Sequence, residues 1–326
     1  MKSLKFEKDI EKFTYNSFDA YFGDMNIAVF DIETLGLMAN KHPVILGGIC
    51  YFDRELTCLQ YFAENLEDEE KVIGDCAREL QKFDAVITFN GNRFDIPFFK
   101  KRANIFDIPL NAFPYHLDLY PVIRKFSDIK HFVPNMKQKT IEKFMGHFER
   151  TDEITGKESI ELYYAYLRLR DTLLKEKILL HNSDDVFQLY RLLDVIKKTD
   201  FHAAMNALGF PFKTSCNRGI ITKIEITGEK LVIKGTIGMS SGEEINFSDK
   251  INYMVNSRGG FKISFDLMPF KGYLIADLRD LMPFENPVNA SPSFADGYLI
   301  VKEGRNIKTF EINMLSKLLT ERIFSR

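Results

Sequence analysis

Hydrophobic residues in the first part of the chain form short apolar runs that fit buried strands. These runs are rich in β-branched and aromatic residues, and polar turns bound them. They predict strands beginning at residue 27 and covering 44–52, 56–62 and 84–89. A tight polar turn at 53–55 predicts that the first three strands form an antiparallel meander.

Apolar stripes at helical spacing lie between and after these strands. They predict helices at 66–83, 93–105, 117–126, 136–145, 160–169 and 184–198. Strands followed by an alternation of strands and helices are typical of a mixed α/β sheet flanked by helices. We therefore predict that architecture for residues 1–205.

The pattern changes near residue 201. After a stretch rich in turn formers, apolar and polar residues alternate around short turns, and Thr227-Gly228-Glu229 predicts a hairpin. Similar alternation follows at 261–267 and 298–310, and a closing helix is predicted at 314–324. We predict a smaller, mostly antiparallel β domain at 215–326, which could guide substrate, form a dimer or bind a protein.

Composition limits the class of protein. A net charge of −2 and a pI near 6.3 argue against a protein that coats nucleic acid, but not against a nuclease whose metal ions bind phosphate. The four cysteines show no Cys-x-x-Cys pairing, which disfavours structural zinc and predicts reduced thiols. Without a visible signal peptide or a long apolar run, we expect a cytoplasmic protein with no membrane partner.

Two carboxylates lie at the end of the first predicted strand. Asp31 and Glu33 are two residues apart, so a strand places both on the same face. Like charges side by side at the end of a buried strand are costly unless a cation lies between them. A divalent metal ion is the obvious candidate, although a single Asp-x-Glu also occurs by chance in a chain of this length.

Two further polar clusters lie where open α/β sheets place their sites. Residues 90–95, Asn-Gly-Asn-Arg-Phe-Asp, follow a predicted strand, so Asp95 would lie in the first turn of the next helix. Residues 181–185, His-Asn-Ser-Asp-Asp, are predicted to begin the last helix of this part, where His181 and Asp185 share a face. For both clusters ordinary helix capping is the alternative.

In this order, Asp-x-Glu, Asn-Gly-x-x-Phe-Asp and His-x-x-x-Asp resemble the three exonuclease motifs of the DEDD superfamily, which has a ribonuclease-H-like fold. The resemblance covers about residues 20–200. Within the superfamily the chain looks most like the bacterial YprB-type branch, in which a Tyr-Tyr-x-Tyr-like stretch precedes the last motif. Here that stretch is Tyr-Tyr-Ala-Tyr at 163–166.

The resemblance implies a two-metal 3′-to-5′ exonuclease that acts on DNA or RNA. The implied metal ligands are Asp31, Glu33, Asp95 and Asp185, and oxygen ligands suit Mg²⁺ or Mn²⁺. His181 completes the candidate catalytic set by orienting or deprotonating the attacking water. It lies four residues before the last Asp, a spacing at which a well-known branch of the superfamily has Tyr.

Other residues are implied to bind substrate or to support the site. The candidate substrate-binding residues are Thr34, Leu35, Leu37, Asn90, Arg93, Lys137 and Lys139. The first three match a segment that packs against the terminal nucleotide, and Asn90 matches a supporting residue. For each basic residue a solvated helix face is the alternative to phosphate contact. Asp118 resembles a recurrent acid of the family, with a helix cap as the alternative.

Two other functions remain open. One is a catalytically quiet module that binds nucleic acid, and the other is a structure-specific endonuclease or resolvase on the same fold. Four clustered acids argue against the quiet module, because such charges are costly without a metal ion. The acids alone do not separate an exonuclease from an endonuclease.

Overall fold

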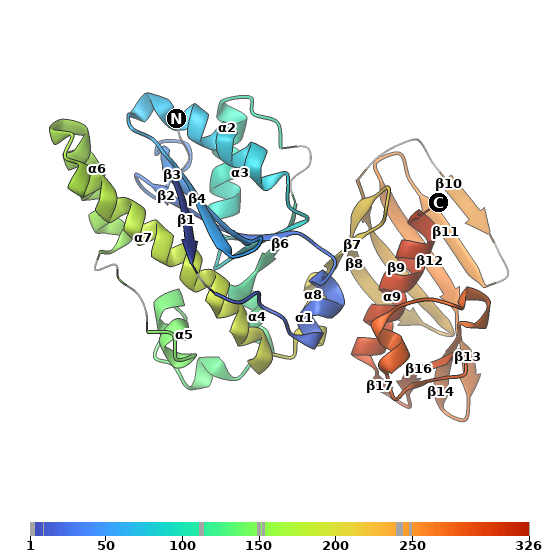
Figure 1. Ribbon diagram of the computed structural model, residues 1–326. Coiled ribbons are helices and arrows are strands. Elements are labelled where there is room, and N and C mark those ends of the chain that lie inside the picture. Colours follow the sequence, from blue (N-terminus) through green and yellow to red (C-terminus); the bar gives the residue numbers. More distant parts are fainter. Residues whose placement is uncertain are drawn as a thin grey trace. The chain divides into compact units, whose positions relative to one another are not determined.

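The computed structural model in Figure 1 describes residues 4–8, 10–110, 114–148, 151, 154–238, 244–247 and 250–325. The chain divides into two compact units. The first comprises Met1–Tyr15 and Met25–Thr199, and the second comprises Asn16–Asp24 and Asp200–Arg326. An early segment of the chain therefore belongs to the C-terminal unit.

A six-stranded mixed sheet, in the order β1-β4-β3-β2-β5-β6, forms the centre of the first unit. Its strands are β1 (Leu4–Lys8), β2 (Ile27–Thr34), β3 (Val44–Phe52), β4 (Leu56–Phe62), β5 (Ala85–Thr88) and β6 (Tyr115–Asp118). Strands β2, β3 and β4 pair antiparallel, which confirms the predicted meander, whereas β2, β5 and β6 are parallel. The sequence pattern misses β1, which is a charged edge strand, and β6, which directly precedes a helix.

Helices flank this sheet, as predicted. The helices of the described part of this unit are α2 (Glu69–Leu80), α3 (Asp95–Ile105), α4 (Leu119–Phe126), α5 (Gln138–Phe144), α6 (Gly156–Leu169) and α7 (Thr172–Arg191). Short 3₁₀ turns cover Leu66–Asp68, Ile129–His131 and Leu192–Lys198. Helix α7 packs against β2, β3 and β4, and α2 packs against β3 and β4 (Figure 1).

Two consecutive glycines in β3 let a helix approach each face of the sheet. A Cβ atom at Gly47 would lie 2.4 Å from Cys76 Sγ on α2, and one at Gly48 would lie 2.2 Å from Asn182 Oδ1 on α7. Because consecutive strand residues point to opposite faces, α2 and α7 cover opposite faces. Asp31 pairs with Gly48 in the β2–β3 register, so its side chain lies on the face that α7 covers.

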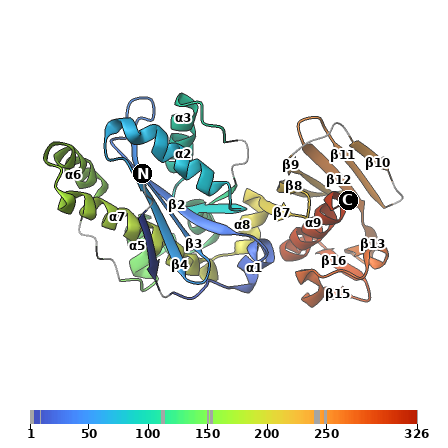
Figure 2. The same cartoon turned by 45° about the horizontal axis from the view of Figure 1, so that its top comes forward.

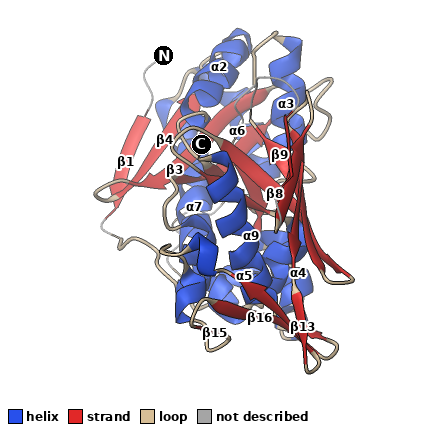
Figure 3. Cartoon of the chain, turned by 90° about the vertical axis from the view of Figure 1, so that its right-hand side faces the viewer, coloured by secondary structure: helices blue, strands red, loops and turns tan. Residues whose placement is uncertain are grey.

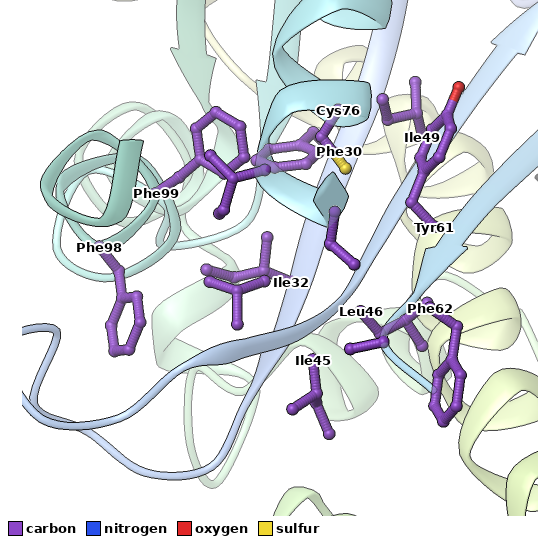
Figure 4. Packing of buried hydrophobic residues seen from close by; sticks show 14 of the residues in the cluster. Phe30, Ile32, Ile45, Leu46, Ile49, Tyr61, Phe62, Cys76, Phe98 and Phe99 are labelled. Atoms are coloured by element: carbon purple, nitrogen blue, oxygen red, sulfur yellow. The ribbon is translucent and has the colours of Figure 1, made fainter. Parts of the chain in front are cut away.

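The hydrophobic core on the α2 side of the sheet holds β2 in place. Phe30 and Ile32, the residues on either side of Asp31 in the strand, are buried there (Figure 4). The Phe30 ring meets the Phe99 ring of α3 edge-to-face, with centroids 5.4 Å apart. Burying a large side chain of this kind contributes about 2 kcal/mol. The apolar half of β2 thus fixes the positions of the acids on its other face.

The second unit contains two antiparallel sheets, which confirms the predicted class (Figure 2). One consists of β7 (Phe210–Lys213), β8 (Arg218–Thr227), β9 (Lys230–Ile237), β10 (Glu244–Phe247), β11 (Ile251–Val255) and β12 (Gly260–Asp266). The other consists of β13 (Met268–Phe270), β14 (Tyr273–Asp277), β15 (Phe294–Ala295), β16 (Tyr298–Glu303) and β17 (Asn306–Ile307). The β8–β9 hairpin turns at the predicted place.

Helix α9 (Thr309–Phe324) packs against β7 and β8 of one sheet and β16 of the other (Figure 3). It begins five residues earlier than the apolar pattern predicts. Helices α1 (Asn16–Phe22) and α8 (Phe201–Leu208) and 3₁₀ turns at Arg279–Leu281 and Pro287–Ala290 complete the described part of this unit.

Candidate active site

Helix α7 carries His181 and Asp185 in its middle. The prediction that 181–185 begin a helix is wrong, because α7 starts at Thr172, where Asp171 caps it by accepting a hydrogen bond from Leu173 N at 2.9 Å. The short polar residues that resemble caps are instead buried and bonded to neighbours. Asp184 Oδ2, for example, accepts from Thr151 N at 2.6 Å. Tertiary hydrogen bonds stabilise these residues inside the helix.

The four predicted metal ligands converge at the carboxyl end of β2. Asp31 and Glu33 lie on the face of β2 that α7 covers, where α7 contributes Asp185. Asp95, the first residue of α3, accepts a hydrogen bond from Ile32 N at 3.4 Å through its Oδ1. One strand and two helix segments thus bring Asp31 close enough to the other three carboxylates to interact electrostatically, and of the four acids Glu33 and Asp185 form with His181 the group whose ligand atoms lie within 4.8 Å of one another.

The electrostatics of Asp31 report this convergence. Burial raises the pKa of its carboxyl well above the ordinary value, and the nearby carboxylates of Asp95, Asp185 and Glu33 raise it further. A hydrogen bond from the Asn182 side chain lowers the pKa but does not cancel the rise. Like charges therefore crowd this point, and a cation is what would stabilise them in their ionised form.

Asp95 shows the same effect to a smaller degree. Burial raises the pKa of its carboxyl to about 7, and the charges of Asp118 and Asp185 act in the same direction. Backbone hydrogen bonds from Asp95 itself and from Ile32 oppose the rise. A carboxyl with a pKa near neutrality in a buried cluster is typical of functional sites.

His181 lies among the carboxylates. Its Nε2 is 3.7 Å from Glu33 Oε1 and 3.6 Å from Asp185 Oδ2, and each of the three residues has a ligand atom within 4.8 Å of the others. The residues therefore fit a divalent cation, because oxygen donors dominate and one imidazole is available. The geometry permits His181 to hold a metal ion as well as a water molecule, whereas the sequence suggests only the second role.

Two residues to which the sequence reasoning gave no site role hold Asp31 in place. Asn182 Nδ2 donates to Asp31 Oδ2 at 3.0 Å, and Asn182 Oδ1 accepts from Gln60 Nε2 at 2.9 Å. Gln60 Nε2 also donates to Leu179 O at 2.8 Å. Two features of the sequence indicate these residues. One is Gln60 inside an apolar strand, and the other is the Gly-Gly pair of the neighbouring strand, where Gly48 makes room for Asn182.

Asp118 organises the loop before Asp95. Its Oδ1 accepts from Asn90 N at 2.7 Å and from Tyr120 N at 2.9 Å, and its Oδ2 accepts from Asn92 N at 3.0 Å. Asp118 therefore caps α4 and also holds the loop in which Asn90 has a positive φ of 62°. The helix cap that the sequence offered as an alternative for Asp118 is therefore confirmed. Asn90 contributes its backbone N–H to this arrangement.

The predicted substrate-binding residues differ in exposure. Leu35 is buried in the core cluster, while Leu37 is 82% exposed. Thr34 is buried, and its Oγ1 donates to Gly36 O at 2.8 Å. Of the basic residues, Arg93 and Lys137 are exposed, and Lys139 Nζ donates to Ile154 O at 3.4 Å.

The part of the chain that matches a known protein family lies mainly in the first unit. Residues 28–197 match a family model described as the RNase_H superfamily. The chain is 25% identical over 192 residues to a DNA polymerase of Archaeoglobus fulgidus, covering 52% of this chain and 22% of the polymerase. It is 29% identical over 83 residues to a DNA polymerase of Methanocaldococcus jannaschii, covering 19% of this chain and 5% of that protein.

Among solved structures, the family B DNA polymerase of the hyperthermophilic archaeon Pyrobaculum calidifontis matches at 21% identity with a TM-score of 0.42. That match covers 53% of this chain and 24% of the polymerase. The chain spans less than a quarter of the length of either curated relative. In the described part of the chain, every helix is too short or too polar to cross a membrane.

Proposed function

Since the chain belongs to the RNase_H superfamily, we propose that it is a metal-dependent nuclease that removes nucleotides from the 3′ end of DNA or RNA. The observation that carries this proposal is the convergence of Asp31, Glu33, Asp95 and Asp185, which raises the pKa of Asp31. The superfamily and the similarity to DNA polymerases support a nuclease-type function on nucleic acid. The 3′-to-5′ direction rests on the resemblance of the motifs to those of DEDD exonucleases.

The four carboxylates are proposed to hold two Mg²⁺ or Mn²⁺ ions. Bound there, the ions would supply positive charge for activating a water molecule and for stabilising the leaving 3′ oxygen. The protein provides a rigid arrangement, in which β2 fixes two acids and the Asn182 side chain orients Asp31. Because the pKa of Asp31 and that of Asp95 are raised, occupation of the site releases protons from the carboxyls.

His181 is proposed to hold or accept a proton at Nε2. An imidazole with an ordinary pKa of about 6.5 changes charge near working pH. Glu33 Oε1 and Asp185 Oδ2 lie 3.7 and 3.6 Å from this nitrogen. In this position His181 is proposed to take a proton from an attacking water.

The exposed residues beside the site are proposed to position the 3′ end. Leu37 offers an apolar surface to the terminal base, and Arg93 and Lys137 offer charges to the phosphates. Leu35 is buried, so its proposed role is to hold the segment that presents Leu37.

Oligonucleotides labelled at the 3′ or the 5′ end test this function. Single- and double-stranded DNA and RNA are incubated with the protein and Mg²⁺ or Mn²⁺, with EDTA as the control. We expect a ladder of 5′-labelled products that shortens from the 3′ end. A single internal cut would replace the proposal with an endonuclease or resolvase. Binding without cleavage under either metal would replace it with a quiet binding module.

A further inference from the structure

The second unit carries a hollow of about 380 Å³ at the tips of three hairpins, here called the hairpin-tip hollow. Gly228 lies at the tip of the β8–β9 hairpin, Lys271-Gly272 at that of β13–β14, and Gly304 at that of β16–β17. Gly304 N donates to Gly272 O at 2.9 Å, so two of the tips are fixed to each other. Other lining residues are Pro269, Phe270, Tyr273, Leu274 and Lys302.

The hairpin-tip hollow is positively charged. Lys271 and Lys302 line it, and its lining contains no carboxylate. Within the described residues neither lysine forms an ion pair with an acid. The neighbouring acid Glu303 already pairs with Lys308 at 3.8 Å and accepts a hydrogen bond from Tyr273 OH at 3.3 Å. The two lysines are thus available to an anionic partner.

An exposed aromatic ring lies beside these charges. Phe270 is 57% exposed, and Lys271 Nζ lies 5.1 Å from the centre of its ring. Phe270 pairs with Tyr273 across the two-residue turn, so the hairpin presents two rings at the same tip. An exposed ring next to unpaired lysines is the arrangement that binds stacked bases and phosphates together.

We propose that the hairpin-tip hollow binds single-stranded nucleic acid. Lys271 and Lys302 contact successive phosphates, and a base stacks on Phe270. An apolar protein partner is disfavoured, because it would bury both lysines without a counter-charge. The proposal deepens the nuclease function by giving the β unit a substrate-binding role, and it rests on that function for the class of ligand.

Fluorescence anisotropy of the intact protein in EDTA tests binding without cleavage. Labelled single-stranded DNA and RNA of about 20 nucleotides are titrated at several salt concentrations. Phe270→Ala should weaken binding about tenfold and leave the salt dependence unchanged, since stacking carries no charge. Lys271→Gln and Lys302→Gln should each reduce the slope of log K against log salt by about 0.7.

The matched control is Lys262→Gln, which removes an exposed lysine of β12 and should change the slope no more than measurement error. Equal effects of Lys262→Gln and Lys271→Gln would overturn the proposal, as would an unchanged affinity in Phe270→Ala. Displacement of the oligonucleotide from the wild-type protein by a poly-glutamate peptide at equal charge concentration would assign the hollow to acidic proteins instead.

A failure of the nuclease proposal can be distinguished from a failure of the proposal for the hairpin-tip hollow. If the wild-type protein cleaves nothing with Mg²⁺ or Mn²⁺ but Phe270→Ala still weakens binding, the result supports the binding role of the hairpin-tip hollow and contradicts the nuclease function. If the protein cleaves and Phe270→Ala leaves both affinity and salt dependence unchanged, the hollow falls alone.

Discussion

Helices α7 and α9 both bury polar side chains, and they do so with opposite results. On α7 the buried His181 and Asn182 reach towards a group of acids whose like charges crowd one another. The raised pKa of Asp31 and that of Asp95 show that the hydrogen bonds of the site do not compensate for burial. The polar face of α7 thus carries an unbalanced charge.

On α9 the buried side chains of Asn313 and Lys317 have several hydrogen-bond or ion-pair partners, although Ser316 Oγ has no hydrogen-bond partner among the described residues. Asn313 Nδ2 donates to Tyr21 OH at 2.8 Å and to His202 O at 2.9 Å, and Asn313 Oδ1 accepts from Asn206 Nδ2 at 2.8 Å. Lys317 Nζ donates to Ala20 O at 3.2 Å and lies near two carboxylates, at 3.6 and 3.9 Å.

The difference separates buried polar groups that stabilise the fold from those that serve a function. A buried polar group with several hydrogen bonds, such as Asn313 on α9, holds elements together. Buried carboxylates that repel one another, as around α7, destabilise the fold unless a ligand neutralises them. Mutations should therefore change stability in opposite directions at the two helices.

The largest effect is expected from Asp31→Asn. Nuclease activity should fall at least about 10³-fold, because the site loses a negative charge that holds the metal ions. Their stabilisation of the transition state is worth several kcal/mol. The metal-free protein should melt at the same temperature or higher, since one repelling charge is gone. Initial rates and melting curves in EDTA measure both quantities. Full activity with a lower melting temperature would place Asp31 with the structural groups of α9.

The pH dependence of stability should reveal Asp95. In the folded chain its carboxyl has a pKa of about 7, whereas in the unfolded chain it titrates near pH 4. The contribution of Asp95 to the free energy of unfolding is fully present below about pH 4 and is lost as the pH rises through 7. Between these values the folded state binds a proton that the unfolded state does not. The free energy of unfolding of the metal-free wild type should therefore fall by a few kcal/mol relative to that of Asp95→Asn across this range. Parallel curves would contradict the raised pKa.

Replacing the structural Asn313 by Leu should lower the free energy of unfolding by about 2 kcal/mol. The substitution removes three hydrogen bonds of the buried Asn313 side chain, to the Tyr21 hydroxyl, the His202 carbonyl and the Asn206 side chain. Nuclease activity per folded molecule should not change. Urea unfolding measures the loss, and the exposed Asn306→Ala serves as the matched control. A variant as stable as Asn306→Ala would show that the network on α9 is dispensable.

The two neighbouring glycines of β3 give a finer test. Gly48→Ala would force Asn182 away from Asp31 and should lower kcat about tenfold, because groups behind metal ligands affect activity by this order. Gly47→Ala meets Cys76 Sγ on the opposite face and should lower the melting temperature without a specific loss of activity. Equal losses of activity in the two variants, measured per folded molecule, would mean that Asn182 has no positioning role.

Local patterns predicted part of the candidate site. The two-residue spacing of Asp31 and Glu33 gives their shared face on a strand, and a strand-to-helix turn gives the place of Asp95. The start of α7 could not be predicted, because residues 182–184 resemble a helix cap and are stabilised in the helix interior only by Thr151 and other distant partners.

Other features of the fold depend on packing between residues that are far apart in the sequence, so local patterns did not predict them. Segment 16–24 belongs to the second unit because Tyr21 packs against Phe201 and Phe210, with ring centroids 5.8 and 5.0 Å apart. These partners are almost two hundred residues away in sequence, so no local pattern indicates them. The buried Gln60 was missed for the same reason, since its role depends on Asn182.

The most direct test of the account is calorimetric titration of the protein with Mn²⁺, in two buffers of different ionisation enthalpy. Crowded carboxyls with raised pKa values predict saturable binding and a release of protons near pH 6, both of which Asp31→Asn should reduce. Absence of Mn²⁺ binding to the wild type, or equal binding and proton release in Asp31→Asn, would contradict the claim that these acids form a cation site.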